Sequence, residues 1–209
     1  RGLGDVYKRQ DVLVISDTPM FDRGVPSICY GLRGLAYLQV ELRGTNSDLH
    51  SGSFGGAVAN PGFVLAQLLS QMKDRSGRIM IPGFYDDVRA LRDEERTAFG
   101  NLPFNERQYR KDLGAPKLGG ERGYTTLERL WARPTFEVNG LLAGFTGDGA
   151  KTVIPAVSMA KVSMRLVPDQ DPETIGDLFE SYLRKVTPKS VELKVSRLHG
   201  GKPLSLIHI

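Results

Sequence analysis

The stretch AVSMAKVSMRLV, residues 156–167, decides the fold, because its small and apolar side chains alternate with a second, more polar set. Such alternation is typical of a β-strand with one buried face. The dipeptide Asp171-Pro172 follows and predicts a helix start, with the aspartate as N-cap and the proline in the first turn. One face of the strand has Ala156, Ser158, Ala160, Val162, Met164 and Leu166, and the other has Val157, Met159, Lys161, Ser163, Arg165 and Val167.

The segments on either side extend this pattern. In GLRGLAYLQVELRG (residues 31–44), Leu38, Val40 and Leu42 alternate with polar residues, which predicts a half-buried strand. Asn60-Pro61 then predicts a helix with an apolar stripe of Leu65, Leu68, Leu69 and Met72. Further strands are expected at TFEVNGLLAG (residues 135–144) and VELKV (residues 191–195). The helix after Asp171 has the apolar face Ile175, Leu178, Phe179, Tyr182, Leu183 and Val186.

The segment 75–135 breaks this regular order. It is rich in charge, glycine and proline, and it predicts helices at about 86–99, 104–113 and 124–132. We interpret it as an insertion packed on the main module. Without it the order is β-α-β-β-α-β, which predicts an α+β fold with a ferredoxin-like antiparallel sheet and two helices on one face.

The two ends of the sequence share an unusual relationship. One coding sequence for DVYKRQ (residues 5–10), GATGTGTATAAGAGACAG, has a reverse complement that encodes LSLIHI (residues 204–209). This inverted repeat resembles a transposase-type sequencing adapter, so we expect residues 1–10 and 204–209 to be non-native and the remainder to be an internal piece of a longer protein. Because His208 lies in the excluded C-terminal segment, His50 and His199 are the histidines that remain as candidates.

The composition fits a globular domain, with 40% hydrophobic residues. The whole sequence has 28 Lys and Arg against 24 Asp and Glu, a net charge of +4. Without Arg1, Lys8, Arg9 and Asp5 these counts become 25 and 23, so the net charge is +2 and does not favour a nucleic-acid or membrane partner. The single Cys29 argues against a disulfide framework, and no apolar run approaches the roughly 20 residues of a membrane span.

Three residues are candidates for catalysis or ligand binding because of their side chains and their positions. Asp17 ends a strand-like run, DVLVISD, where a ligand could bind, although its spacing by itself favours a cap of the turn before Pro19. His50 lies in the glycine-rich turn SDLHSGSFGG (residues 47–56), where it is either functional or a solvent-facing loop residue. Arg165 interrupts an apolar strand and is either a carboxylate clamp or a solvated, ion-paired side chain.

Two glycine-rich segments complete the set of candidates. FTGDGAKTVIP (residues 145–155) contains Thr152 but lacks the spacing of a phosphate-binding loop. HGGKP (residues 199–203) places His199 in a turn that we expect just after the last strand. Each signal is weak by itself.

Taken together, six motifs in one order carry a resemblance that covers residues 11–203: ISD, YGLRG, DLHSGSFGG, GAKTVIP, RLVPDQDP and HGGKP. The sequence resembles the metal-dependent dipeptidases of the carnosinase and cytosolic non-specific dipeptidase branch. The wider family includes acetylornithine deacetylase, succinyl-diaminopimelate desuccinylase, aminoacylase and carboxypeptidase G. The long insertion favours the dipeptidase branch.

The resemblance implies a domain organisation. Residues 11–33 would end the first segment of an α/β catalytic domain, and residues 34–199 would form a lid and dimerisation domain with its insertion at about 75–135. Residues 200–203 would begin the return to the catalytic domain. The intact enzyme would be a cytoplasmic homodimer that binds a small peptide, with no nucleic-acid or membrane partner.

The resemblance also implies roles for single residues. Asp17 would bind one of two divalent metal ions, zinc or else manganese or cobalt, whose other ligands lie outside this chain. His50 would reach into the active site of the other subunit and stabilise the oxyanion of the scissile carbonyl. Arg165 would bind the substrate carboxylate, and Thr152 and His199 would contact substrate.

The expected reaction is hydrolysis of a dipeptide, and the fragment alone is expected to be inactive. Two alternatives remain open. The intact protein could be an N-acyl-amino-acid deacylase or a carboxypeptidase of the same family. The chain could also be a non-catalytic ferredoxin-like dimerisation module, which would need neither His50 nor Arg165.

Overall fold

The computed structural model describes residues 20–205. The chain divides into two units, Arg1–Tyr30 and Gly31–Ile209. In the first unit a short turn brings Asp22 and Val25 together through a backbone hydrogen bond of 3.0 Å. The predicted strand at residues 11–17, Asp17 and His208 lie outside the described residues. The predicted domain boundaries stay predictions.

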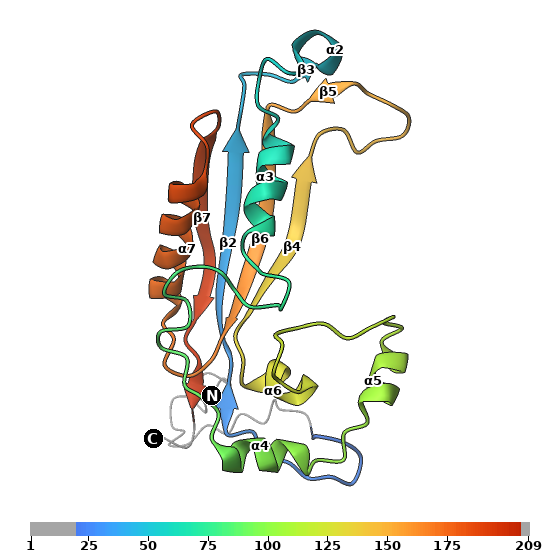
Figure 1. The fold of residues 1–209 in the computed structure, drawn as a ribbon, viewed down its shortest axis with the longest axis vertical. Coiled ribbons are helices and arrows are strands. Elements are labelled where there is room, and N and C mark those ends of the chain that lie inside the picture. Colours follow the sequence, from blue (N-terminus) through green and yellow to red (C-terminus); the bar gives the residue numbers. More distant parts are fainter. Residues whose placement is uncertain (1–19, 206–209) are drawn as a thin grey trace, which may run out of the picture. The chain divides into compact units, whose positions relative to one another are not determined.

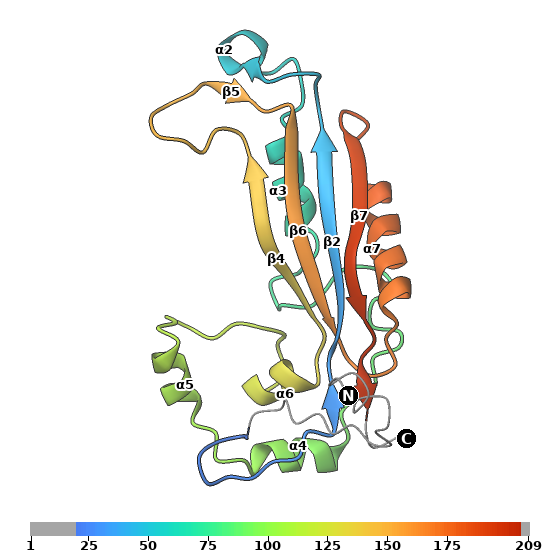
Figure 2. The same ribbon diagram turned by 180° about the vertical axis from the view of Figure 1, so that it is seen from behind.

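The second unit is built on a four-stranded antiparallel sheet, with its strands in the order β4-β6-β2-β7. Both long helices cover the same face of this sheet (Figures 1 and 2). In chain order the main elements are β2 (Gly34–Arg43), α3 (Pro61–Ser70), β4 (Thr135–Ala143), β6 (Val157–Leu166), α7 (Pro172–Val186) and β7 (Glu192–Gly201). The predicted β-α-β-β-α-β order and α+β class are therefore confirmed.

Both helix starts have the predicted caps. The Asn60 side chain accepts a hydrogen bond from Gly62 N, and the Asp171 carboxylate accepts from Glu173 N and Thr174 N. A proline occupies the first turn in each case, where its missing N–H costs no hydrogen bond. Local chemistry thus fixes where each helix begins.

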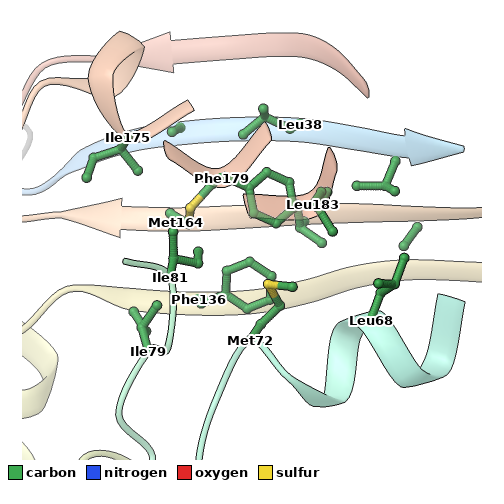
Figure 3. Close-up of a cluster of buried hydrophobic side chains, with 14 of the residues drawn as sticks. Leu38, Leu68, Met72, Ile79, Ile81, Phe136, Met164, Ile175, Phe179 and Leu183 are labelled. Carbon is green, nitrogen blue, oxygen red and sulfur yellow. The ribbon is translucent and has the colours of Figure 1, made fainter. Parts of the chain in front are cut away.

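The hydrophobic core lies between the helices and the sheet (Figure 3). The predicted alternation of β2 and β6 is confirmed, because every second residue of each strand is buried. The core side chains shown there include Leu38 of β2, Phe136 of β4, Met164 of β6, Leu68 of α3, and Phe179 and Leu183 of α7. Among the described residues of the second unit, no helix covers the opposite face of the sheet (Figure 2), which we call the uncovered face.

The insertion contains three short helices: α4 (Asp93–Gly100), α5 (Glu106–Asp112) and α6 (Thr126–Trp131). All three lie towards the end of the sheet at which β2 begins (Figures 1 and 2). The predictions for α5 and α6 were correct to within two residues, whereas α4 begins later than predicted. Residues 86–92 form turns and coil, because Arg92 is the N-cap and its N–H donates to the Glu95 carboxylate.

Ion pairs fix the insertion internally. Arg133 and Glu121 are both buried and form two hydrogen bonds of 2.8 and 2.9 Å. Burial by itself lowers the pKa of Arg133, but the hydrogen bond and charge of Glu121 outweigh it, so the pKa is raised. The guanidinium of Arg133 also stacks over Tyr124, with 4.3 Å to the ring centroid. The carboxylate of Glu121 therefore compensates the buried positive charge of Arg133 inside the insertion.

Three shorter elements lie at the end of the sheet where β2 ends: β3 (Leu49–His50), α2 (Ser51–Phe54) and β5 (Val153–Ile154) (Figure 1). A further pair of two-residue strands is formed by β1 (Gly31–Leu32) and β8 (Leu204–Ser205). Among the described residues, no helix is long and apolar enough to cross a membrane.

Candidate functional site

The turn that contains His50 is fixed to the distant segment 152–156. β3 pairs with β5, so that Leu49 lies opposite Ile154 and His50 opposite Val153. The Asp48 carboxylate accepts a hydrogen bond of 2.8 Å from Ala156 N, just before β6. Because Asp48 ties the turn to the sheet on one side of His50, the backbone of this histidine has a defined position.

The imidazole ring of His50 contacts groups at both of its nitrogens. Gly52 N donates a hydrogen bond of 2.9 Å to Nδ1, and Thr152 Oγ1 lies 3.2 Å from Nε2. Ser51 N also donates to the carbonyl of Thr152 at 3.0 Å. Both His50 and Thr152 are exposed. Two residues that the sequence indicated separately therefore form one exposed polar group, the His50–Thr152 pair.

A long loop borders this pair. Residues 144–152 are all exposed and contain Gly144 and Gly149 at positive φ, a backbone region that favours glycine. Within the loop, Lys151 Nζ lies 5.8 Å from the centroid of the Phe145 ring. The His50–Thr152 pair thus lies beside a solvent-exposed, glycine-containing loop.

Arg165 lies on the uncovered face of the sheet. It stands opposite Leu35 of β2 and Thr135 of β4, and it is exposed. Burial and the positive charge of Arg165 lower the pKa of the nearby Arg33. Within residues 20–205, neither arginine forms an ion pair with a carboxylate. Two close guanidinium groups of this kind suit an external carboxylate.

His199 lies inside β7 and not after it, so its predicted place in a turn was wrong. Gly200 and Gly201 continue the strand, because they pair with Ala36 and Leu35 of β2. The register shifts between Leu38, which pairs with Arg197, and Tyr37, which pairs with His199, so Leu198 is an extra residue in a β-bulge.

The bulge decides which way His199 faces. In a regular strand, residues two apart share a face. The extra residue places Arg197 on the helix side, where it forms ion pairs with Glu173 and Asp177 of α7. His199 then shares the uncovered face with its neighbour Tyr37 and with Arg165, two strand spacings away.

The two groups of candidates lie at opposite ends of the sheet. Arg165 pairs near the start of β2, whereas His50 follows the end of β2 at Arg43. Arg43 lies eight positions after Leu35, which corresponds to roughly 26 Å in an extended strand. The structure therefore brings His50 together with Thr152, and it places Arg165 and His199 on the same face of the sheet near its other end. It does not bring these two groups together.

The described residues do not supply a metal site. Among residues 20–205, no group of three or more His, Cys, Asp or Glu side chains could hold a metal ion. The predicted ligand Asp17 lies outside this range. Asp48 and Gly52 are part of the site but have no motif of their own in the sequence. Their one local signal is that both lie within two residues of His50, where side-chain-to-backbone hydrogen bonds are common.

Comparison with known proteins identifies what this geometry resembles. The peptidase dimerisation domain family matches residues 30–191. The Cys-Gly metallodipeptidase DUG1 of Candida albicans is 35% identical over 199 residues, which cover 93% of this chain and 41% of that protein. The crystal structure of human carnosine dipeptidase 1 has a TM-score of 0.77 at 33% identity, over 86% of this chain and 39% of that one.

A third similar protein is named for a different activity. The M20 family metallo-carboxypeptidase Sso-CP2 of Sulfolobus solfataricus is 34% identical, with a TM-score of 0.75 over 88% of this chain and 48% of that one. The present chain thus spans less than half the length of each of these relatives.

Proposed function

The chain belongs to the peptidase dimerisation domain family, and on that premise we propose that it is the dimerisation lid of a binuclear metal-dependent dipeptidase. The observation that carries the proposal is the separation of the His50–Thr152 pair from Arg165. These are the residues expected to contact a substrate, yet they lie at opposite ends of one sheet. The intact enzyme must therefore combine them in another way.

The length of the substrate excludes one protomer as the source of both groups. An extended dipeptide spans at most about 7 Å. Arg165 lies beside Leu35 and His50 follows Arg43, and the strand between Leu35 and Arg43 spans roughly 26 Å. One small substrate can touch both side chains only if they come from different protomers. Each active site of a dimer would then use Arg165 of one subunit and His50 of the partner subunit.

The edge of the sheet offers a surface for that dimer. β4 is an edge strand, and it carries the exposed side chains Leu141 (59%) and Leu142 (52%). Phe63 of α3, at 72%, follows Gly62, whose Cα lies close to Ala143 at the end of β4. An unpaired apolar edge of this kind associates readily with another strand. We propose a second copy of the chain as its occupant.

The symmetry of such a dimer would bring the two groups together. A two-fold axis perpendicular to the sheet pairs β4 antiparallel with its copy. The start of β4, where Thr135 stands opposite Arg165, would then lie beside the end of β4 of the partner subunit. The chain leaves that end through the loop that leads to Thr152. The dimer would thus place Arg165 near His50 of the partner subunit.

In this arrangement each side chain has a defined task. His50 would donate a hydrogen bond from Nε2 to the carbonyl oxygen as negative charge develops there, a contribution of about 3–4 kcal/mol to the barrier. Arg165 would bind the substrate's terminal carboxylate with two parallel hydrogen bonds. Thr152 and His199 would contact the substrate beside these two residues.

The metal ions belong to the part of the enzyme beyond residues 20–205. We propose Asp17 as one ligand and zinc as the metal, with manganese or cobalt as alternatives. The described side chains do not form a donor set, so they would bind and orient the substrate and would not hold the ions. We also propose a cytoplasmic location.

A substrate panel on the intact enzyme tests the reaction. Unmodified dipeptides should be hydrolysed, whereas N-acetyl amino acids should not. The similarity to a metallo-carboxypeptidase favours one second candidate, which would also cleave the C-terminal residue from longer peptides. Preference for N-acetyl amino acids would contradict the dipeptidase proposal, and cleavage of longer peptides would support the carboxypeptidase.

A further inference from the structure

The ring of His50 lies directly against the Cα of Gly52. A Cβ atom at residue 52 would be 2.6 Å from Cε1 of the ring and 3.0 Å from Nδ1. Real Cβ atoms essentially never show contacts as short as the first of these distances. The ring can therefore occupy this position only while residue 52 has no side chain.

The backbone gives no other reason for glycine at this position. Gly56, in the same turn, has φ +86°, where glycine is strongly favoured, but Gly52 is not among the residues with positive φ. Gly55 differs again, because a Cβ there would meet the carbonyl of Ser51. Of the three glycines in this turn, Gly52 is the one whose added side chain would collide with the imidazole of His50.

The hydrogen bond from Gly52 also selects the protonation state of the ring. Gly52 N donates to Nδ1, so Nδ1 must present a lone pair. In a neutral imidazole the proton then resides on Nε2. Nε2 faces Thr152 Oγ1 at 3.2 Å, and both side chains are exposed, so an N–H at this atom can turn from the hydroxyl to an incoming oxygen.

We propose that Gly52 is a positioning residue: its N–H and its lack of a side chain hold His50 as the neutral Nε2–H tautomer with Nε2 beside Thr152. The inference rests on the proposed function for its catalytic meaning, since an oxyanion needs a donor and Nδ1 already accepts the hydrogen bond from Gly52 N. It also explains a glycine that the turn itself does not require.

Nitrogen NMR on the 209-residue chain tests the hydrogen bond without any measurement of activity. A scalar coupling across the N–H···N hydrogen bond should connect the Gly52 amide with Nδ1 of His50, and long-range proton–nitrogen correlations should show the proton on Nε2. A His50→Gln variant identifies the His50 signals. His199, which has no comparable hydrogen bond among the described residues, should show no such coupling.

Matched variants of neighbouring residues sharpen the test. Gly52→Ala should abolish the coupling while the amide signals of β2 and β6 stay in place, whereas Ser53→Ala should retain it. If Gly52→Ala does not fold, the coupling in the unmodified chain still decides the question. A proton on Nδ1, or no coupling in the unmodified chain, would overturn the inference.

Kinetics of the intact enzyme give the second readout. Gly52→Ala should lower kcat by about tenfold to a hundredfold with little change in KM, approaching the loss expected for His50→Ala. In a His50→Ala background it should have no further effect, because the ring that it displaces is already absent. An additional loss of the same size in that background would contradict the positioning role. If His50→Ala itself has no effect, the proposed function fails, while the NMR result still decides the tautomer.

Discussion

Thr152 Oγ1 lies 3.2 Å from His50 Nε2, although 102 residues separate the two along the chain. The contact exists because β3 and β5, two strands of two residues each, pair at the end of the sheet. Asp48 and Ala156 add a hydrogen bond beside them. A small set of backbone contacts thus converts two exposed residues into one polar group with fixed geometry.

The first prediction concerns His50 in the intact enzyme. His50→Ala should lower kcat by about a hundredfold, because one oxyanion donor typically contributes a factor of that size. KM should change little. Steady-state kinetics with a dipeptide and elemental analysis of the protein provide the measurement. Metal content equal to that of the unmodified enzyme is the control, since a lost metal would also lower kcat. An unchanged kcat would favour a non-catalytic dimerisation module.

The second prediction concerns the guanidinium of Arg165. Arg165→Lys should raise KM for dipeptides by about tenfold or more, because an ammonium group cannot form two parallel hydrogen bonds with a carboxylate. The comparison substrate is the same dipeptide with an amidated C-terminus, for which KM should change much less. Equal increases for the two substrates would remove the carboxylate-binding role of Arg165.

The third prediction concerns the edge of the sheet. Leu142→Lys on β4 should convert the proposed dimer of the intact enzyme to a monomer, because a charge would be buried in the proposed interface. Sedimentation velocity measures the oligomeric state. Leu198→Lys on β7 is the matched control: Leu198 has a similar exposure, 48% against 52%, but lies on the opposite edge strand. If the Leu142 variant remains dimeric, or if Leu198→Lys dissociates the dimer, the β4 interface is wrong.

The fourth prediction concerns the stability of the insertion. Glu121→Ala should reduce the free energy of unfolding by about 3–5 kcal/mol, because it leaves the buried guanidinium of Arg133 without its carboxylate. Glu137→Ala, which removes the exposed partner of Lys73, should cost at most about 1 kcal/mol. Urea unfolding of the two variants measures the difference. Equal losses would show that burial of the Glu121–Arg133 pair has no special effect on stability.

The sequence predicted those parts of the fold that depend on local chemistry. The alternation in β2 and β6 reflects one buried face, and the Asn60-Pro61 and Asp171-Pro172 pairs mark helix starts through their own hydrogen bonds. The late start of α4 also had a local signal. Asp93, Glu94 and Glu95 occupy its first turn, where acidic side chains are favoured, so the charge pattern points to a start near residue 93.

The remaining features depend on contacts between distant segments. Gly200 and Gly201 resemble a turn, but β2 supplies hydrogen-bonding partners that keep them in β7. No local pattern indicates the bulge at Leu198, which orients His199. The pairing of Thr152 with His50 depends in the same way on how β3 and β5 meet. The sequence could therefore indicate the site residues one by one, but not which of them lie together.

The most direct test of the account is complementation between two inactive variants. Protomers with His50→Ala and protomers with Arg165→Ala, carrying different affinity tags, can be coexpressed and the mixed dimer isolated. One site of that dimer combines two intact side chains and the other lacks both. We predict that the mixed dimer regains about half the kcat/KM of the unmodified enzyme, although each parent variant has a low kcat/KM. A mixed dimer no more active than its parents would contradict the claim that one active site takes Arg165 and His50 from different subunits.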